Sequence, residues 1–511
     1  MQVTVLGPEG PLKRALRDEA ARAGWVESED AAAVVCLAPD AVDAALQRPG
    51  LRRLVVRSTA YVYGSSDKNP GLMTEERVSL LPDNAPEQRW LRAEERALSF
   101  PNTAVLRLTN ILAPEEGDFV VRQLASRIGR AVAGRDPNVQ FLSLGDAARA
   151  FVAALQSDAT GIFNIAGDGA IPLKKAYKAA GVIRLPGLAV GPTRALEFNW
   201  TVSAERAARE LGFRAEKSTR QALAGFLDGR ARPGLLDRSY DDFGLDLDYI
   251  RAWGAWFWFL RNVYWRIDFE GLENIPATGR AMYVSNHRGF MPLDAVMHLS
   301  LVLAQRERVI RFLIIPSLLR MPFLSNFLTK LGGVIANQVN AERLFNDEDL
   351  VGIFPEGIRG AFSRRPYAYK VRDFARSAFA KIAIENQAPL VLSTVVGHWE
   401  IFPIIGRIDS TWFSKTYGWP YVPIAPMFPL APIPIPSKWH VRVLPPIPVS
   451  GLRREDAENP RLVKEFANYV QAVMQRNLDD MRGKRRSIFW GRVLDGTAPP
   501  APAFESKSVA P

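Results

Sequence analysis

The feature that most constrains the fold of this chain is an alternation of short apolar runs with helical stretches over residues 1–230. Apolar runs of this length, each followed by helix-like or turn sequence, are typical of the buried strands of a parallel sheet. The runs are Val3–Leu6, Ala33–Leu37, Leu54–Ser58 and Ala104–Leu108, and the clearest helical stretch is Leu12–Gly24. The pattern predicts an α/β fold with a doubly wound parallel sheet.

A glycine-containing turn joins the first of these runs to the first helix. Gly7 and Gly10 have the place and partial form of a dinucleotide-binding loop. In such loops the glycines let the backbone approach a pyrophosphate at a helix N-terminus. Gly7 and Gly10 are therefore candidate cofactor-binding residues, although Lys13 stands where the third glycine belongs.

Further motifs make this region resemble an extended short-chain dehydrogenase/reductase of the sugar-epimerase kind. The motifs are Arg57–Gly64, Val105–Asn110, Val139–Asp146, Gly161–Gly167 and Glu210–Phe213. The resemblance implies a Rossmann-like fold that binds NAD(P).

The chemistry of that family is incomplete in this chain. The resemblance implies a catalytic tyrosine with a lysine four residues later, and Glu87 and Leu91 stand at those positions. Thr59 alone matches the catalytic triad, and the stretch Trp25–Asp30, which should supply an acidic residue for the ribose, is short. Three interpretations stay open: a non-catalytic domain used for regulation or docking, nucleotide binding without turnover, and an active oxidoreductase.

A different motif lies in the C-terminal half. A short apolar run from Tyr283 ends in Asn286 and His287, and Asp294 follows seven residues after the histidine. A histidine beside a carboxylate can act as a general base, because the carboxylate fixes the tautomer and stabilises the imidazolium. If the intervening residues are helical, the two side chains share a face, since two turns take about 7.2 residues. If Pro292 instead starts a helix, His287 lies on the preceding loop and the pair meets through loop geometry.

A second motif follows some sixty residues later. The strand-like run Leu350–Phe354 leads into Pro355, Glu356, Gly357 and, two residues on, Arg359. A carboxylate, a flexible glycine and a cation held together can bind an anionic or polyol group.

In order and separation, these motifs resemble the glycerolipid acyltransferase superfamily, in particular its monoacylglycerol-acyltransferase-like branch. The resemblance covers residues 268–447, although six residues separate the histidine from the aspartate where the commonest family pattern has four. It implies that a fatty acyl group moves from acyl-CoA or acyl-carrier protein to a hydroxyl of a glycerolipid or lysophospholipid. The residues to which it assigns roles are His287 and Asp294 in catalysis and Asn286, Glu356, Gly357 and Arg359 in acceptor binding. We expect no metal and no cofactor for this reaction.

Several neighbouring features have two interpretations each. The apolar stretch 312–337 can line an acyl-chain groove or belong to the core. The cations between Arg364 and Arg372 can bind a phosphate or form a solvated face. His398 is an alternative base without the motif around it.

Composition suggests where such an enzyme works. The net charge is +11, and tryptophan-rich or proline-rich apolar segments occupy 249–266 and 412–439, while cations and aromatic residues mix over 482–492. Indole rings favour the membrane interface and cations favour anionic headgroups, although segment 249–266 can also pack on the core. We find no transmembrane stretch, signal peptide or nucleic-acid-binding motif, and the single cysteine fits a reducing compartment. We therefore expect a peripheral protein at the cytoplasmic face of a membrane.

The expected domains are a non-catalytic Rossmann-like domain of the epimerase/reductase type over residues 1–230, a linker with an aromatic helix over 231–267, an acyltransferase domain over 268–482, and a basic-aromatic segment with a tail over 483–511. The alternative function is an NAD(P)-dependent epimerase or reductase with a lipid-anchoring C-terminal half. The sequence leaves open the acyl acceptor, the acyl chain length, the thioester carrier and the oligomeric state.

Overall fold

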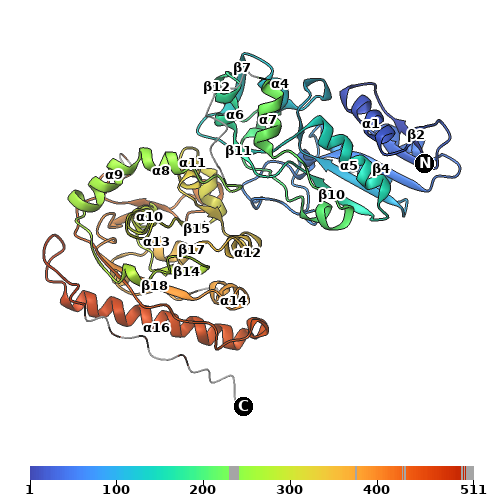
Figure 1. The fold of residues 1–511 in the computed structure, drawn as a ribbon. Coiled ribbons are helices and arrows are strands. Elements are labelled where there is room, and N and C mark those ends of the chain that lie inside the picture. The colour runs from blue at the N-terminus through green and yellow to red at the C-terminus, as the bar shows by residue number, and fades with distance from the viewer. Residues whose placement is uncertain are drawn as a thin grey trace. The chain divides into compact units, whose positions relative to one another are not determined.

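Two separate sheets organise the chain, one in each half (Figure 1). The computed structural model describes residues 1–228, 241–374, 377–428, 430, 433–496, 499, 501 and 504. The first compact unit consists of Met1–Leu245 with Pro322–Thr329, and the second of Asp246–Met321 with Lys330–Pro511. Within the predicted linker, residues 231–240 lie outside the described residues.

The first unit is built on a six-stranded sheet in which every pairing is parallel. In spatial order its strands are β10 (Gly161–Ile165), β5 (Thr103–Leu108), β4 (Arg53–Thr59), β3 (Ala33–Cys36), β1 (Gln2–Leu6) and β2 (Val26–Glu27). The chain fills the sheet outward from β1 in both directions, which is the topology of a doubly wound Rossmann-like fold. The predicted fold class is therefore confirmed.

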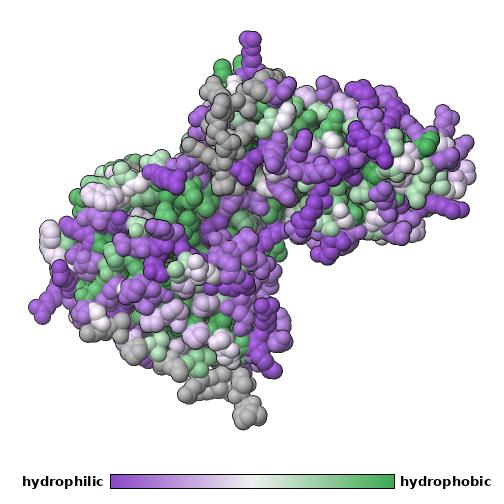
Figure 2. Space-filling model, viewed as in Figure 1, coloured by the Kyte–Doolittle hydropathy of each residue, from purple (hydrophilic) through white to green (hydrophobic). Residues whose placement is uncertain are grey.

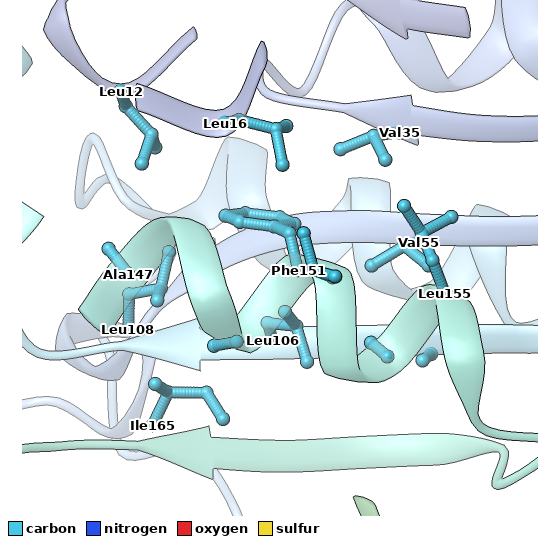
Figure 3. Packing of buried hydrophobic residues seen from close by; sticks show 14 of the residues in the cluster. Leu12, Leu16, Val35, Val55, Leu106, Leu108, Ala147, Phe151, Leu155 and Ile165 are labelled. Carbon is cyan, nitrogen blue, oxygen red and sulfur yellow. The ribbon is translucent and has the colours of Figure 1, made fainter. Parts of the chain in front are cut away.

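Helices cover both faces of this sheet, because its strands are apolar on both sides. The helices of the unit are α1 (Pro11–Arg22), α2 (Ala41–Leu46), α3 (Gln88–Ala97), α4 (Phe119–Leu124), α5 (Leu144–Gln156), α6 (Leu173–Ala179) and α7 (Thr219–Leu227). On one face α1 packs against α5, and Figure 3 shows Phe151 of α5 between Leu16 of α1 and Leu106 of β5. Full burial of a side chain of this size contributes about 1.5–3 kcal/mol.

Short strand pairs complete the first unit beyond the main sheet. They are β6 (Asn110–Ile111) with β9 (Phe141–Leu142), β7 (Ile128–Val132) with β12 (Ile183–Gly187), and β8 (Asn138–Val139) with β11 (Ile171–Pro172).

The second unit is built on a seven-stranded sheet. In spatial order its strands are β13 (Asp268–Glu270), β21 (His440–Val443), β18 (Leu390–Val396), β14 (Ala281–Ser285), β17 (Leu350–Ile353), β15 (Ile310–Ile314) and β16 (Val334–Ile335). The central strand β14 is parallel to both of its neighbours, β17 and β18, and all five of its residues are buried. A separate hairpin-like pair joins β19 (Gly406–Ile408) to β20 (Val422–Ile424).

Helices also cover this second sheet. The helices of the second unit are α8 (Leu247–Ala252), α9 (Gly254–Phe259), α10 (Leu293–Arg306), α12 (Gln338–Asn346), α13 (Gly357–Ala361), α14 (Ala378–Glu385), α15 (Thr411–Tyr417) and α16 (Pro460–Lys484). All of α11 (Leu324–Lys330) except its last residue groups with the first unit. In Figure 1, α9 and α10 lie on one side of the strands and α14 and α16 on the other.

One apolar segment belongs to the first unit, although the residues before and after it in the sequence belong to the second. Residues Pro322–Thr329, in the stretch for which we considered an acyl groove or the core, group with the first unit. There the amide of Phe323 donates to the carbonyl of Gly134 at 2.9 Å. This part of the stretch is thus not core of the second unit.

Candidate active site

Three parallel strands of the second sheet end at the same edge, and each is followed at once by a candidate residue. His287 follows β14 by two residues, Glu356 follows β17 by three, and His398 follows β18 by two. Because parallel strands place their carboxyl ends together, residues far apart in the sequence gather here.

His287 and Asp294 form a direct hydrogen bond. Nδ1 of His287 lies 2.6 Å from Oδ2 of Asp294, whose side chain is fully buried. The other carboxylate oxygen accepts from the amide of Ala295 at 2.9 Å, which holds the group in place. Residues 286–292 are not helical, and Pro292 is the N-cap of α10, so the pair meets through loop geometry and the shared-helix-face prediction is wrong.

This geometry selects one nitrogen of His287 for chemistry. An ionised carboxylate only accepts, so Nδ1 must carry the proton and Nε2 is left with its lone pair. Nε2 has no hydrogen-bond partner in the part of the chain that the structure describes, and the side chain is 15% exposed. The ring stacks on Phe354 with centroids 4.5 Å apart, which restricts its rotation.

The other three histidines of the chain are buried and held neutral. Burial lowers the pKa of His298 to about 4, and its ring nitrogens lie 2.9 Å from the Tyr283 hydroxyl and 3.1 Å from that of Ser285. Burial likewise lowers the pKa of His440 to about 4. His287 is thus the histidine with both an exposed edge and a bonded carboxylate.

His398, the alternative base, is poorly placed for proton transfer. It is 2% exposed, and burial followed by the positive charge of Arg288 holds its pKa well below the ordinary value. Among the described residues its Nδ1 has no hydrogen-bond partner. A ring this enclosed cannot meet a substrate hydroxyl without a rearrangement.

Asn286 continues the pairing of two strands with its side chain. Its Nδ2 donates to the carbonyl of Val395 at 3.0 Å, and its Oδ1 accepts from the amide of the same residue at 2.8 Å. The side chain thereby joins the end of β14 to β18 and sets the direction in which the chain leaves toward His287. Asn286 is 1% exposed, so this bonding is its main interaction.

The carboxylate of Glu356 is fully buried and paired with Arg288. Both side chains are 0% exposed, and Nη1 of Arg288 lies 2.8 Å from Oε2 of Glu356. Oε1 also accepts from the amide of His287 at 3.0 Å, and Oε2 from the amide of Arg372. The remaining donors of Arg288 reach the carbonyls of Ala368 and Lys370. Glu356 therefore joins the base to the loop after α13, although the resemblance implied acceptor binding.

The rest of the second motif forms the start of α13. Gly357 has φ +52°, a conformation that glycine adopts without strain. Arg359 is exposed and makes no ion pair or hydrogen bond through its side chain with the residues that the structure describes. Gly360 allows close approach, because a Cβ there would lie 2.9 Å from the carbonyl of His287 and 2.6 Å from Cβ of Glu356.

The six residues between His287 and Asp294 bury an aromatic side chain. Phe290 is 4% exposed and contacts several rings of the following loops. Its neighbours are Phe428 (ring centroids 4.6 Å apart), Phe402 (5.0 Å), Trp419 (5.9 Å) and Phe362 (6.2 Å). Through Phe290, the loop between His287 and Asp294 thus packs against the segment 402–428.

Two of these residues, Arg288 and Gly360, lie outside the set predicted from the sequence. Their roles depend on carbonyls and side chains some seventy to eighty residues away. The one clue to a buried ion pair is an arginine directly after the candidate histidine, in an otherwise apolar stretch.

Most cations predicted near lipid or phosphate have partners inside the protein. Arg372 lies over the Tyr367 ring at 4.0 Å, and Arg485 is paired with Glu400 in a buried position. Arg364, Arg365 and Lys370 are exposed. A ligand role in the segment 364–372 is therefore open to these three side chains.

In the first unit, the predicted turn lies between β1 and α1. Gly7 has φ +127°, and a Cβ there would lie 3.0 Å from Leu37. Gly10 is the extended N-cap of α1. Glu87, at the position of the missing tyrosine, is the N-cap of α3, and Thr59 caps the turn that follows β4 by accepting from the amide of Tyr61.

No helix among the described residues is both long and apolar enough to cross a membrane. No group of three or more His, Cys, Asp or Glu side chains within them is arranged to hold a metal ion.

A family model described as Acyltransferase matches residues 266–396, which include His287, Asp294 and Glu356. The second unit therefore contains an acyltransferase domain. A chicken (Gallus gallus) protein named "DGAT1/2-independent enzyme synthesizing storage lipids" is 28% identical over 188 residues, covering 37% of this chain and 54% of that protein.

Longer similarity links the chain to mycobacterial proteins. An uncharacterized protein of Mycobacterium leprae is 32% identical over 303 residues, covering 57% of this chain and 79% of that protein. An uncharacterized protein of Mycobacterium tuberculosis is 32% identical over 281 residues, covering 53% and 76%. This chain belongs to the same family as these proteins.

Solved structures also resemble part of the chain. A UDP-N-acetylglucosamine 4-epimerase from Bacillus cereus covers 44% of this chain and 98% of its own, with 16% identity and a TM-score of 0.36. A UDP-glucose 4-epimerase from Thermotoga maritima covers 45% and 98%, with 15% identity and a TM-score of 0.36.

Proposed function

We propose that the protein transfers a fatty acyl group from a thioester, acyl-CoA or acyl-carrier protein, to a hydroxyl of a glycerolipid or lysophospholipid. The observation that carries the proposal is the 2.6 Å contact between Nδ1 of His287 and Asp294, inside the acyltransferase domain. It leaves Nε2 as a general base at the exposed edge of the ring.

His287 acts on the acceptor hydroxyl. Nε2 takes the hydroxyl proton as the oxygen attacks the thioester carbonyl carbon, and Asp294 stabilises the imidazolium that forms. The tetrahedral intermediate then loses the thiolate, which takes the proton from Nε2, so the products are an ester and a free thiol. The base is regenerated without an acyl-enzyme.

A cysteine nucleophile does not fit this chain. Cys36 is the single cysteine and lies in β3 of the first unit. Burial raises the pKa of its thiol to about 12, so the nucleophilic thiolate is suppressed.

The exposed cations that follow Glu356 in the sequence are the groups proposed to bind the acyl acceptor or the thioester donor. Arg359 is the third residue of α13, the short helix that begins directly after Glu356, and its side chain has no hydrogen-bond or ion-pair partner among the described residues. Its planar guanidinium suits a phosphate or a polyol. We assign Glu356 to holding the amide of His287, and Gly357 to the turn that starts α13.

The proposal includes contact with an anionic bilayer, because the acceptor is a lipid. Phe257 and Leu260 are buried, whereas Trp256 and Trp258 are 51% and 55% exposed and Val263 is 49% exposed. We call Trp256, Trp258 and Val263 the exposed apolar group. Figure 2 shows green and pale residues over α8 and α9 on the second unit. Half-exposed indole rings favour the membrane interface.

A second exposed aromatic segment lies close to the same helices. Arg266, which follows them, donates to the carbonyl of Phe489 at 2.9 Å and lies over the Trp490 ring at 4.5 Å. Trp490 is 67% exposed, and Arg486 nearby in the sequence is exposed as well. Aromatic side chains with cations beside them support peripheral binding, and we place the protein at the cytoplasmic face of a membrane.

The test is thiol release from acyl-CoA with a panel of lysolipids, glycerides and alcohols, with acyl-carrier protein as the second donor. We compare the wild type with His287→Gln, and equal melting temperatures verify that the variant is folded. Acceptor-dependent release that is lost in His287→Gln supports the proposal and identifies the acceptor class. Release that persists in the variant, or no release with either donor and any acceptor, refutes it.

A further inference from the structure

The first unit has the topology of a dinucleotide-binding fold, so its ligand crevice can be located. In open α/β sheets, ligands bind beyond the carboxyl ends of the strands, where the strand order reverses. Here the order reverses between β1 and β3. In this fold family the pyrophosphate of NAD(P) lies on the N-terminal amides of the first helix, which here is α1.

In this chain, a carboxylate already occupies the N-terminus of α1. Oε1 of Glu116 accepts from the amide of Leu12 at 2.8 Å. Pro11, at the start of the helix, has no amide hydrogen to offer. A Cβ added at Gly10 would lie 3.2 Å from the same carboxylate oxygen, so Glu116 stands against the glycine that should admit a pyrophosphate.

The position of Glu116 is fixed by a cation. Its Oε2 lies 2.6 Å from Nη1 of Arg57, and the two side chains are 8% and 13% exposed. Arg57 lies near the C-terminal end of β4, and β3 separates β4 from β1 in the sheet. The carboxylate is thus held by a helix N-terminus on one side and a guanidinium on the other, which is the pair of donors that a phosphate group prefers.

The remaining groups of the crevice also disfavour a dinucleotide. Lys13 donates to the carbonyl of Gly7 at 3.1 Å and pairs with Glu9 at 2.9 Å, so its charge is used locally. The cavity left beside the turn measures about 310 Å³, and four acidic residues (Glu9, Asp40, Glu115 and Glu116) line it together with three basic ones (Lys13, Arg57 and Arg89). Lys13 and Arg57 are already paired with Glu9 and Glu116. At the N-terminus of α1 itself, a pyrophosphate would meet the like charge of the Glu116 carboxylate.

We propose that Glu116, held by Arg57, fills the phosphate site of the first unit, so that this unit does not bind NAD(P). The expected cofactor and the residues present do not fit each other. Of the interpretations that the sequence left open, the structure favours a domain that keeps the Rossmann-like fold without its nucleotide.

Removal of the carboxylate should expose the anion site that it fills. Glu116→Ala leaves Arg57 and the Leu12 amide without their acceptor, and the variant should melt several degrees below the wild type. Inorganic pyrophosphate should raise the melting temperature of Glu116→Ala and leave that of the wild type unchanged, since only the variant has a vacant site. Glu115→Ala is the matched control, because Glu115 lines the same cavity and is exposed.

Calorimetric titration of the full-length wild type with NAD⁺, NADH and NADPH, up to about 1 mM, provides the second measurement. It does not depend on the folding of a variant, and we expect no saturable binding. Saturable binding to the wild type overturns the proposal. So does a folded Glu116→Ala variant that pyrophosphate stabilises no more than it stabilises the wild type or Glu115→Ala.

Discussion

At the scale of single residues, the proposed mechanism makes Asp294 the group that selects Nε2 of His287 as the base. Its Oδ2 accepts from Nδ1 of His287 at 2.6 Å and from the amide of Arg288 at 3.3 Å. Asp294→Asn keeps the shape and removes the charge, and an amide can donate to the ring and favour the wrong tautomer. We expect kcat to fall by about 10²- to 10⁴-fold with a small change in KM. Steady-state kinetics measure both; an unchanged kcat would show that the carboxylate is dispensable.

A second prediction at this scale concerns Glu356, whose buried ion pair with Arg288 should stabilise the fold. Removal of one partner of a buried ion pair leaves an uncompensated charge, which typically costs about 3–5 kcal/mol. We therefore expect Glu356→Gln to lower the free energy of unfolding by about that amount, as measured by urea denaturation. The matched control is Glu348→Gln, since Glu348 pairs with Arg280 at the surface and its loss should change stability little.

The same variant distinguishes two roles of Glu356. A Glu356→Gln protein of wild-type stability with a raised KM would mean that the carboxylate binds the acceptor, as the family resemblance implied. A large loss of stability assigns it to the support of His287.

At the scale of elements, the parallel strands were predictable because their apolar runs are continuous and short. The residues at the ends of β14 and β17 were also predictable, since each motif directly follows its run. The hydrogen bonds of Asn286 to Val395 and of Arg288 to Ala368 were not, because they join residues 80 or more positions apart. The short β2 was anticipated from the shortened stretch after Trp25.

The two tryptophans of the exposed apolar group, which both lie in α9, lead to a prediction about an element. Trp256→Ser with Trp258→Ser removes two half-exposed rings, so the fold should keep its melting temperature. If these rings enter a bilayer interface, partitioning onto anionic vesicles should weaken about tenfold or more, or about 1.4 kcal/mol. Vesicle co-sedimentation measures this change. Leu188→Ser in the first unit, at a side chain 79% exposed, is the control that should bind as the wild type does.

At the scale of the whole molecule, titratable groups differ between the two units. All four histidines lie in the second unit, and burial lowers the pKa of His298 and His440 to about 4 and that of His398 well below its ordinary value. In the first unit, burial raises the pKa of Asp118 to about 6. As the pH falls, these groups should therefore lower the stability of the second unit and raise that of the first.

The direction in which stability changes with pH follows from proton binding in the folded and unfolded states. Between pH 6.5 and 4 (the ordinary histidine value is about 6.5), an unfolded chain protonates these histidines while the folded second unit does not. Their contribution to stability is complete above about pH 6.5 and is lost as the pH falls toward 4, by up to about 1.4 kcal/mol per pH unit for each histidine. Asp118 binds its proton near pH 6 in the folded first unit and only near 4 when unfolded, so its contribution rises over the same range.

Tryptophan fluorescence can follow the second unit within the intact chain. Of the 12 tryptophans, Trp25, Trp90 and Trp200 lie in the first unit, which leaves nine in the second. We expect the urea midpoint of the fluorescence transition to fall markedly between pH 7 and 5, and His298→Asn to make this fall shallower because one buried neutral histidine is removed. A midpoint that is unchanged between these pH values would mean that the buried histidines do not stay neutral in the folded protein, and the choice of His287 as the one accessible base would lose its electrostatic support.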